Sequence, residues 1–100
     1  MSGLHHLQVK EIQRLTDDAV AISFSIPKEL KPHFSFKAGQ YLTLSQSIGD
    51  EQVRRSYSLC SAPHEGVLRV GIKAIPNGLF SNYANKQIKV GDTFEVGAPE

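Results

Sequence analysis

The sequence predicts an all-β domain in which six antiparallel strands form a small barrel or sandwich, with one short helix between the last two strands. Apolar and polar residues alternate with the period of a strand through most of the chain, and turn-forming residues interrupt this alternation at intervals of roughly ten residues. A single late stretch carries apolar residues at helical spacing and predicts the helix.

The first two strands are predicted at 7–15 and 19–26, joined by a turn at 16–19. The first stretch alternates imperfectly, because the next apolar residue of the pattern after Val9 is Ile12, and this slip predicts a bulge. The second stretch has the clearest period of two in the chain. Its apolar face consists of Val20, Ile22, Phe24 and Ile26.

The next strands form a predicted hairpin. Two prolines exclude a strand from the connection 27–36, which has room for one helical turn at most. The third strand follows at 40–48 and the fourth at 51–60. Gly49 and Asp50 between them favour a tight hairpin turn, so these two strands should pair directly.

The last third of the chain contains the fifth strand, the helix and the sixth strand. The fifth strand is predicted at 67–75 and ends at a Pro-Asn-Gly break. The short helix begins near Leu79, and Leu79 and Tyr83 mark the face that we expect to pack. A turn at 90–92 then leads to the last strand at 93–99.

Composition excludes several classes of protein. The net charge is +1 and the charged residues are well mixed, which argues against a nucleic-acid surface. One cysteine allows neither an internal disulfide nor an iron–sulfur cluster, and the four histidines lack metal-ligand spacing, so we expect no metal site. Without a bilayer-length apolar run or a signal-peptide pattern, we expect a cytoplasmic protein.

The stretch RRSYSLCS, residues 54–61, is the first candidate site. In a strand, Arg55 and Tyr57 share one face and Arg54 lies on the other. An arginine beside a tyrosine offers a cation for a phosphate group next to an aromatic surface. The same pattern also suits an ordinary edge strand with one solvated face and a packed tyrosine, and spacing alone leaves both interpretations open.

The stretch NGLFSN, residues 77–82, is the second candidate. Gly78 opens the helix and Ser81 falls in its first turn, where free backbone N–H groups and the helix dipole favour an anion. An ordinary turn with a local serine cap is the alternative. Both motifs suit phosphate, and the first adds an aromatic surface, as a nucleotide or flavin would require.

These motifs carry a family resemblance. RSYS, then a strand with GIK, then GLFSNY, resembles the flavin-binding domain of the ferredoxin–NADP reductase family, from about residue 7 to residue 99. Upstream, FKAGQYLTL is similar to that family's segment before its third strand. RRSYSLCS and VGIKAIPNGLFSNYA look most like the iron–sulfur flavoreductases that include the reductase component of the phenylacetyl-CoA epoxidase system. The resemblance implies a six-stranded antiparallel Greek-key barrel with one helix.

The resemblance also implies roles for individual residues. Arg55 would pair with the FAD pyrophosphate, Tyr57 would stack on the isoalloxazine, and Ser58 would act catalytically by placing its hydroxyl near flavin N5. Strict alternation puts Ser58 opposite Tyr57, so the strand should end or bend there. Backbone contacts to the cofactor would come from Ile72, Lys73, Gly78, Leu79 and Phe80, with Ser81 beside them.

At the level of the whole protein, the resemblance implies that residues 1–100 are the FAD-binding domain of an NAD(P)H-dependent electron-transfer oxidoreductase. Electrons would pass from nicotinamide through flavin to an iron–sulfur centre or oxygenase partner. No glycine-rich βαβ motif or cysteine quartet occurs here, so NAD(P)H and 2Fe-2S sites are expected on other domains, and the excised domain is expected to be inactive alone. FMN is the alternative cofactor, and a β-barrel binding or interaction module without flavin is the alternative function.

One position departs from the family pattern. Asn77 stands where many relatives carry a glycine. Asparagine adopts positive φ more readily than most residues, so we expect the turn before the helix to be preserved.

Overall fold

The structure, a computed structural model, describes residues 4–62 and 65–100. Within these ranges it contains six strands, a 3₁₀ helix (η1) and an α-helix (α1), and no helix there is long and apolar enough to cross a membrane. The elements in chain order are β1 (Leu4–Thr16), β2 (Ala19–Ser25), η1 (Lys28–Phe34), β3 (Tyr41–Ile48), β4 (Glu51–Ser58), β5 (Leu68–Lys73), α1 (Leu79–Lys86) and β6 (Thr93–Gly97).

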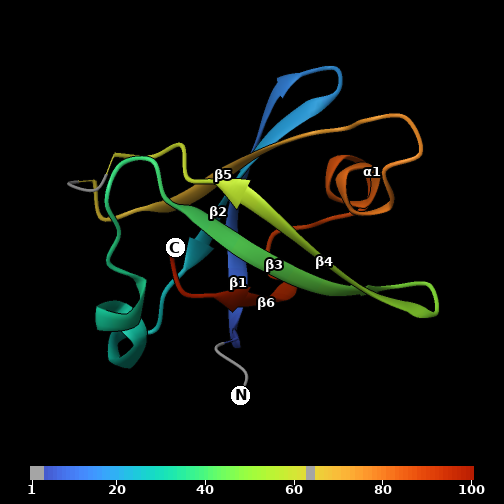
Figure 1. The fold of residues 1–100 in the computed structure, drawn as a ribbon. Coiled ribbons are helices and arrows are strands. Elements are labelled where there is room, and N and C mark those ends of the chain that lie inside the picture. Colours follow the sequence, from blue (N-terminus) through green and yellow to red (C-terminus); the bar gives the residue numbers. More distant parts are fainter. Residues whose placement is uncertain (1–3, 63–64) are drawn as a thin grey trace.

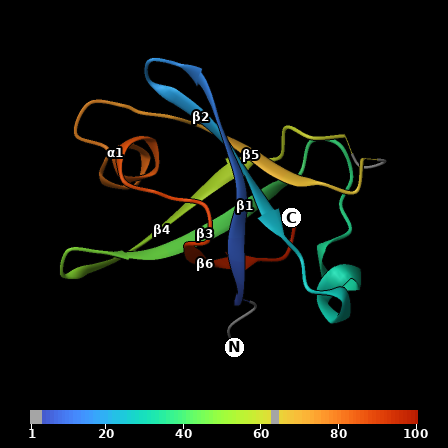
Figure 2. The ribbon, with the colours of Figure 1, turned by 180° about the vertical axis from the view of Figure 1, so that it is seen from behind.

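The strands form one antiparallel sheet in the order β4-β3-β6-β1-β2-β5. The sheet curls until its two edge strands meet at a single bridge between Leu59 and Val70 (Figure 1). Beyond that bridge β4 and β5 diverge, and α1 lies beside the opening, as the view from behind also shows (Figure 2). The expected all-β Greek-key barrel is confirmed, with one side held open between its edge strands.

The long first strand changes register along its length. Its pairing with β2 shifts between Val9 and Glu11 and again between Arg14 and Thr16, which confirms the expected bulge. The strand also begins earlier than its sequence pattern indicated, because residues from Leu4 onward pair with β6. The strand β1 therefore pairs with β2 on one side and with β6 on the other, and so joins β4-β3-β6 to β2-β5 in the sheet.

Aromatic rings link the core to the open side of the barrel. Phe94 of β6 lies at the centre, with its ring centroid 5.9 Å from Phe24 and 5.8 Å from Phe80 of α1. Phe80 in turn lies 5.7 Å from the ring of Tyr57 on β4. These contacts place Tyr57 at the outer end of a continuous aromatic row that begins in the core.

The connection between β2 and β3 forms more helix than expected. Its seven residues, Lys28–Phe34, form a 3₁₀ helix with Pro32 inside. At about three residues per turn this is roughly two turns, where the prolines predicted one at most. Phe34 is buried and Leu30 packs against the core, so tertiary contacts support a helix that the local sequence disfavours.

The helix α1 buries a different face from the one that sequence spacing indicated. Leu79 is 41% exposed, whereas Phe80 is 1% exposed and Ala84 of the next turn is also buried. Tyr83 packs only partly against the core. The helix contacts β2, β3, β4 and β5. The face of the helix that is turned toward these strands is the one that is buried.

Candidate functional site

A pocket of about 240 Å³ lies where β4, the end of β5 and the start of α1 come together. This is the open side of the barrel, where the edge strands β4 and β5 each have only one neighbouring strand. Its lining consists of Arg55, Ser56, Tyr57, Lys73, Ile75, Gly78, Leu79, Phe80 and Ser81. Seven of the nine cofactor-binding residues expected from the family resemblance therefore line one pocket, and Ser56 and Ile75 are additions.

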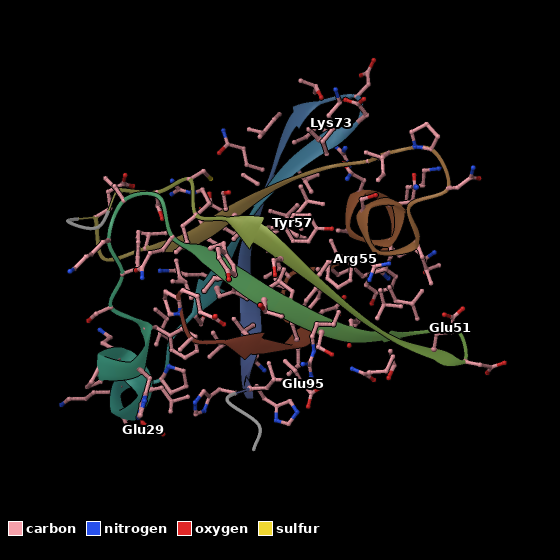
Figure 3. The ribbon with its side chains drawn as sticks, viewed as in Figure 1. Glu29, Glu51, Arg55, Tyr57, Lys73 and Glu95 are labelled. Atoms are coloured by element: carbon pink, nitrogen blue, oxygen red, sulfur yellow. The ribbon has the colours of Figure 1, made fainter. Side chains whose placement is uncertain are left out.

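Arg55 and Tyr57, two of the three expected site residues of β4, have their side chains on the side of the strand that faces α1 (Figure 3). Tyr57 is half-buried against Phe80, which leaves part of its ring facing the pocket. Arg55 is exposed, and one Nη1–H donates to the carbonyl oxygen of Arg54 at 2.7 Å. A guanidinium has five N–H donors, so this contact orients Arg55 and leaves donors for an anion.

The start of α1 supplies backbone donors to the same pocket. Gly78 is the N-cap, and no side chain caps the helix there. The N–H of Asn82 bonds to the carbonyl oxygen of Gly78 as the first helical hydrogen bond, so the amides of the preceding turn lack helical partners. These amides and the positive end of the helix dipole lie beside the Arg55 cation, which is a suitable arrangement for a phosphate group.

Side chains of α1 hold the loop that precedes it. The Ser81 hydroxyl accepts a hydrogen bond from the Ile75 N–H at 3.2 Å, and the Asn82 amide donates to the Ile75 carbonyl oxygen at 2.9 Å. Asn77 has a φ of 62°, as its residue type led us to expect. The Ser81 side chain thus stabilises the loop, and its backbone N–H is the group left for a ligand.

Gly78 is required by packing. A Cβ atom there would lie 2.5 Å from both Ile75 Cγ1 and Ser81 Oγ. The exposed Ile75 side chain has room to move, but Ser81 Oγ moves only by giving up its hydrogen bonds to the loop.

We therefore expect Gly78→Ala to lower the free energy of unfolding by about 1–3 kcal/mol, the usual cost of overpacking. Gly71→Ala is the matched control, because a Cβ there meets nothing within 4 Å. Urea denaturation of both variants measures the difference. Equal stability of the two would contradict the steric argument.

Two expected residues do not line the pocket. Ser58 is the last residue of β4 and pairs with Tyr41, so the strand ends where alternation required. Its role near flavin N5 stays a prediction. The Ile72 side chain is 1% exposed, and its carbonyl oxygen accepts a hydrogen bond from the Asn85 amide. The expected backbone contact of Ile72 with the cofactor stays a prediction.

Burial raises the pKa of the Tyr57 phenol above its ordinary value of 10.0, and the nearby Arg55 charge partly offsets this rise. Because this pKa is higher in the folded chain, the folded chain holds the phenolic proton more tightly than the unfolded chain does. The contribution of Tyr57 to stability is full below pH 10.0 and is lost as the pH rises through the folded-state pKa.

We expect the free energy of unfolding to fall more steeply above pH 10.0 in the wild type than in Tyr57→Phe. Chemical denaturation at a series of alkaline pH values tests this. Parallel pH profiles would show that the Tyr57 phenol titrates alike in both states.

The residues present fit a flavin nucleotide. A partly exposed tyrosine ring suits stacking. A guanidinium with unused N–H donors, beside an uncapped helix N-terminus, suits a phosphate or pyrophosphate.

Asn85 and Arg14, which hydrogen-bond to each other at the end of α1, were not expected from the sequence. The only available signal was an asparagine one turn after Ser81 on the helix.

Comparison with known proteins agrees with this geometry. Residues 6–100 match the family described as the oxidoreductase FAD-binding domain. The chain is 41% identical over 100 residues to one of the subunits of the 1,2-phenylacetyl-CoA epoxidase of Escherichia coli, covering 100% of this chain and 28% of that protein. It is 36% identical to the ferredoxin reductase component of 3-ketosteroid-9-alpha-monooxygenase of Rhodococcus rhodochrous, covering 93% of this chain and 27% of that protein.

Solved structures share the fold. Phthalate dioxygenase reductase matches with a TM-score of 0.81 and 27% identity, over 98% of this chain and 30% of that chain. A ferredoxin NADP⁺ reductase from Neisseria gonorrhoeae matches with a TM-score of 0.82 and 23% identity, over 100% of this chain and 39% of that chain.

The chain spans about a quarter of the length of its curated relatives, 28% of the epoxidase subunit and 27% of the monooxygenase reductase component. With the family match covering residues 6–100, this chain belongs to the oxidoreductase FAD-binding domain family.

Proposed function

We propose that this chain is the flavin-binding unit of an NAD(P)H-dependent reductase that delivers electrons to an iron–sulfur centre or an oxygenase partner. The observation that carries the proposal is the single pocket in which Arg55, Tyr57 and the start of α1 meet. Family membership and the two relatives above, one from an epoxidase and one from a monooxygenase, support it over a β-barrel module without flavin.

Each part of the pocket has a separate task. The Arg55 guanidinium and the N–H groups of Leu79, Phe80 and Ser81 hold the pyrophosphate. The Tyr57 ring, supported from behind by Phe80, stacks on the isoalloxazine and excludes water from one face. Ser58, at the end of β4 and outside the pocket lining, would place its hydroxyl near flavin N5. Lys73, at the end of β5, would border the flavin with its backbone and add positive charge to the pocket.

When bound, FAD supplies the link between a two-electron nicotinamide donor and a one-electron acceptor. The chain contributes binding, orientation and charge. We assign the nicotinamide site and any 2Fe-2S centre to domains outside residues 1–100. The match to phthalate dioxygenase reductase, described as a modular structure for electron transfer from pyridine nucleotides to [2Fe-2S], supports that division.

A titration with FAD tests the binding half of the proposal. We expect quenching of flavin fluorescence and a shifted visible flavin spectrum as the site fills. A chain that leaves both signals of free FAD unchanged would be a barrel module without flavin.

The same proposal predicts that the FAD-loaded chain alone does not oxidise NADH or NADPH efficiently. Holding a donor in near-attack geometry supplies roughly 7–11 kcal/mol of barrier reduction, and we assign the residues that do so to another domain. Stopped-flow anaerobic reduction measures the rate. Saturable reduction on the order of 10 per second would place a nicotinamide site on this chain and overturn the domain assignment.

A further inference from the structure

The helix α1 is too short to hold its own position. It has eight residues, and isolated helices below roughly 12–15 residues are marginal in water. Its N-terminus nevertheless has to present backbone N–H groups to a phosphate at a defined place. Contacts from the rest of the fold must therefore set where this helix lies.

Arg14, on β1, contacts the opposite end of the helix. Its Nη1 donates to the side-chain oxygen Oδ1 of Asn85 at 2.9 Å, and its Nη2 donates to the Asn85 backbone carbonyl oxygen. Nη1 also lies 3.4 Å from the carbonyl oxygen of Thr16, beside the register shift of β1. A cation at this end suits the helix dipole, and the guanidinium fork satisfies the two oxygens of one residue.

Asn85 connects Arg14 to two backbone groups near the pocket. It is 7% exposed, and its Nδ2 donates to the carbonyl oxygen of Ile72 at 3.1 Å and to that of Ser81 at 2.8 Å. Both acceptors belong to residues expected in the cofactor site. With Oδ1 held by Arg14, the amide can present its two N–H donors in only one orientation.

We propose that Arg14 is a positioning residue for the phosphate-binding end of α1, acting through Asn85 on the backbone of Ser81 and Ile72. The inference rests on the proposed function, because it takes the start of α1 as the phosphate site. Arg14 itself is not among the residues that line the pocket. It sets the distance between α1 and the end of β5, and so the place where the phosphate is held.

The test compares Arg14→Met with the wild-type chain. Methionine keeps the apolar stem and removes all five donors. We expect FAD and FMN to bind roughly three- to thirtyfold more weakly, the range seen when a residue in a coupled network is changed. Riboflavin lacks the phosphate, so its affinity should change less, and the ratio of FMN to riboflavin affinity should fall. Flavin fluorescence titrations measure all three ligands.

Arg69→Met is the matched control. Arg69 is another strand arginine that makes side-chain contacts, with a hydrogen bond of 3.3 Å to Ser23 Oγ and an ion pair of 3.5 Å to Glu65. It is partly buried, whereas Arg14 is exposed, and it does not line the pocket. Its FMN to riboflavin ratio should equal that of the wild type. Arg14→Lys, which keeps the charge and loses the fork, should fall between Arg14→Met and the wild type.

Two outcomes overturn the inference in different ways. Equal losses for FAD, FMN and riboflavin in Arg14→Met would show a purely structural role for this arginine. Unchanged FAD affinity in Arg14→Met, together with weaker FAD binding in Arg55→Ala, would remove Arg14 from the site and leave the proposed function standing. Unchanged FAD affinity in both variants would refute the proposed site itself.

Discussion

Replacing Arg55 with alanine is expected to weaken FAD binding by roughly ten- to a hundredfold, because a charge-assisted hydrogen bond to phosphate contributes about 1.5–3 kcal/mol. Arg55 lies in the pocket beside the uncapped start of α1, and its exposed side chain keeps donors available for an anion. Its guanidinium is oriented by the Arg54 carbonyl oxygen, a backbone group that the substitution does not remove.

The neighbouring arginine provides a matched control for this effect. Arg54 has the same side chain and is also exposed, but strand alternation turns it to the other face of β4, and it does not line the pocket. Arg54→Ala should therefore change FAD affinity by less than about threefold, as for a distant surface charge. A fluorescence titration of both variants at one ionic strength decides. Equal losses would mean that total positive charge, and not Arg55, holds the cofactor.

Phe80→Ala is expected to produce the largest loss of stability, about 3–5 kcal/mol, as for other buried phenylalanines. The Phe80 side chain is 1% exposed and lies between the rings of Tyr57 and Phe94, at 5.7 and 5.8 Å. Its removal leaves a cavity under α1 and takes away the support of the Tyr57 ring. Both the loss of stability and the loss of support for Tyr57 follow from this one substitution, because Phe80 contacts Phe94 in the core and Tyr57 in the pocket.

Leu79→Ala is the control, since Leu79 precedes Phe80 on the same helix and is 41% exposed. Its free energy of unfolding should change by less than about 1 kcal/mol. Urea denaturation followed by circular dichroism compares the two. A larger loss from Leu79→Ala than from Phe80→Ala would mean that the helix packs through the face that the sequence spacing indicated, and not through Phe80.

The strands of the barrel were predictable because each one faces a core on one side. Alternation in β2 predicted its span, and Gly49 and Asp50 predicted the hairpin between β3 and β4. The slip after Val9 predicted the bulge in β1. These signals are local, since they depend on the two faces of one strand or on the φ values of one turn.

The buried face of α1 was not predictable from such local signals. Leu79 and Tyr83 have helical spacing, yet Phe80 and Ala84 are the buried pair, because the direction of the gap between β4 and β5 selects the face. A helix with apolar residues on two sides carries no information about which side its neighbours occupy. The extension of η1 to seven residues likewise depends on burial of Phe34.

The residue types of the site could be predicted from the sequence. Arg55 with Tyr57 and Gly78 with Ser81 indicated a phosphate group beside an aromatic surface, because charge, ring and free backbone donors are properties of single residues and short segments. That both motifs line one pocket follows from the three-dimensional arrangement of the strands and α1. The first motif lies on the edge strand β4, and the second follows the opposite edge strand β5. They meet because Leu59, just after β4, forms a bridge with Val70 of β5, and the two strands then separate beside α1. The link from Arg14 to Asn85 spans 71 positions, and pattern in one sequence carries no signal at that range.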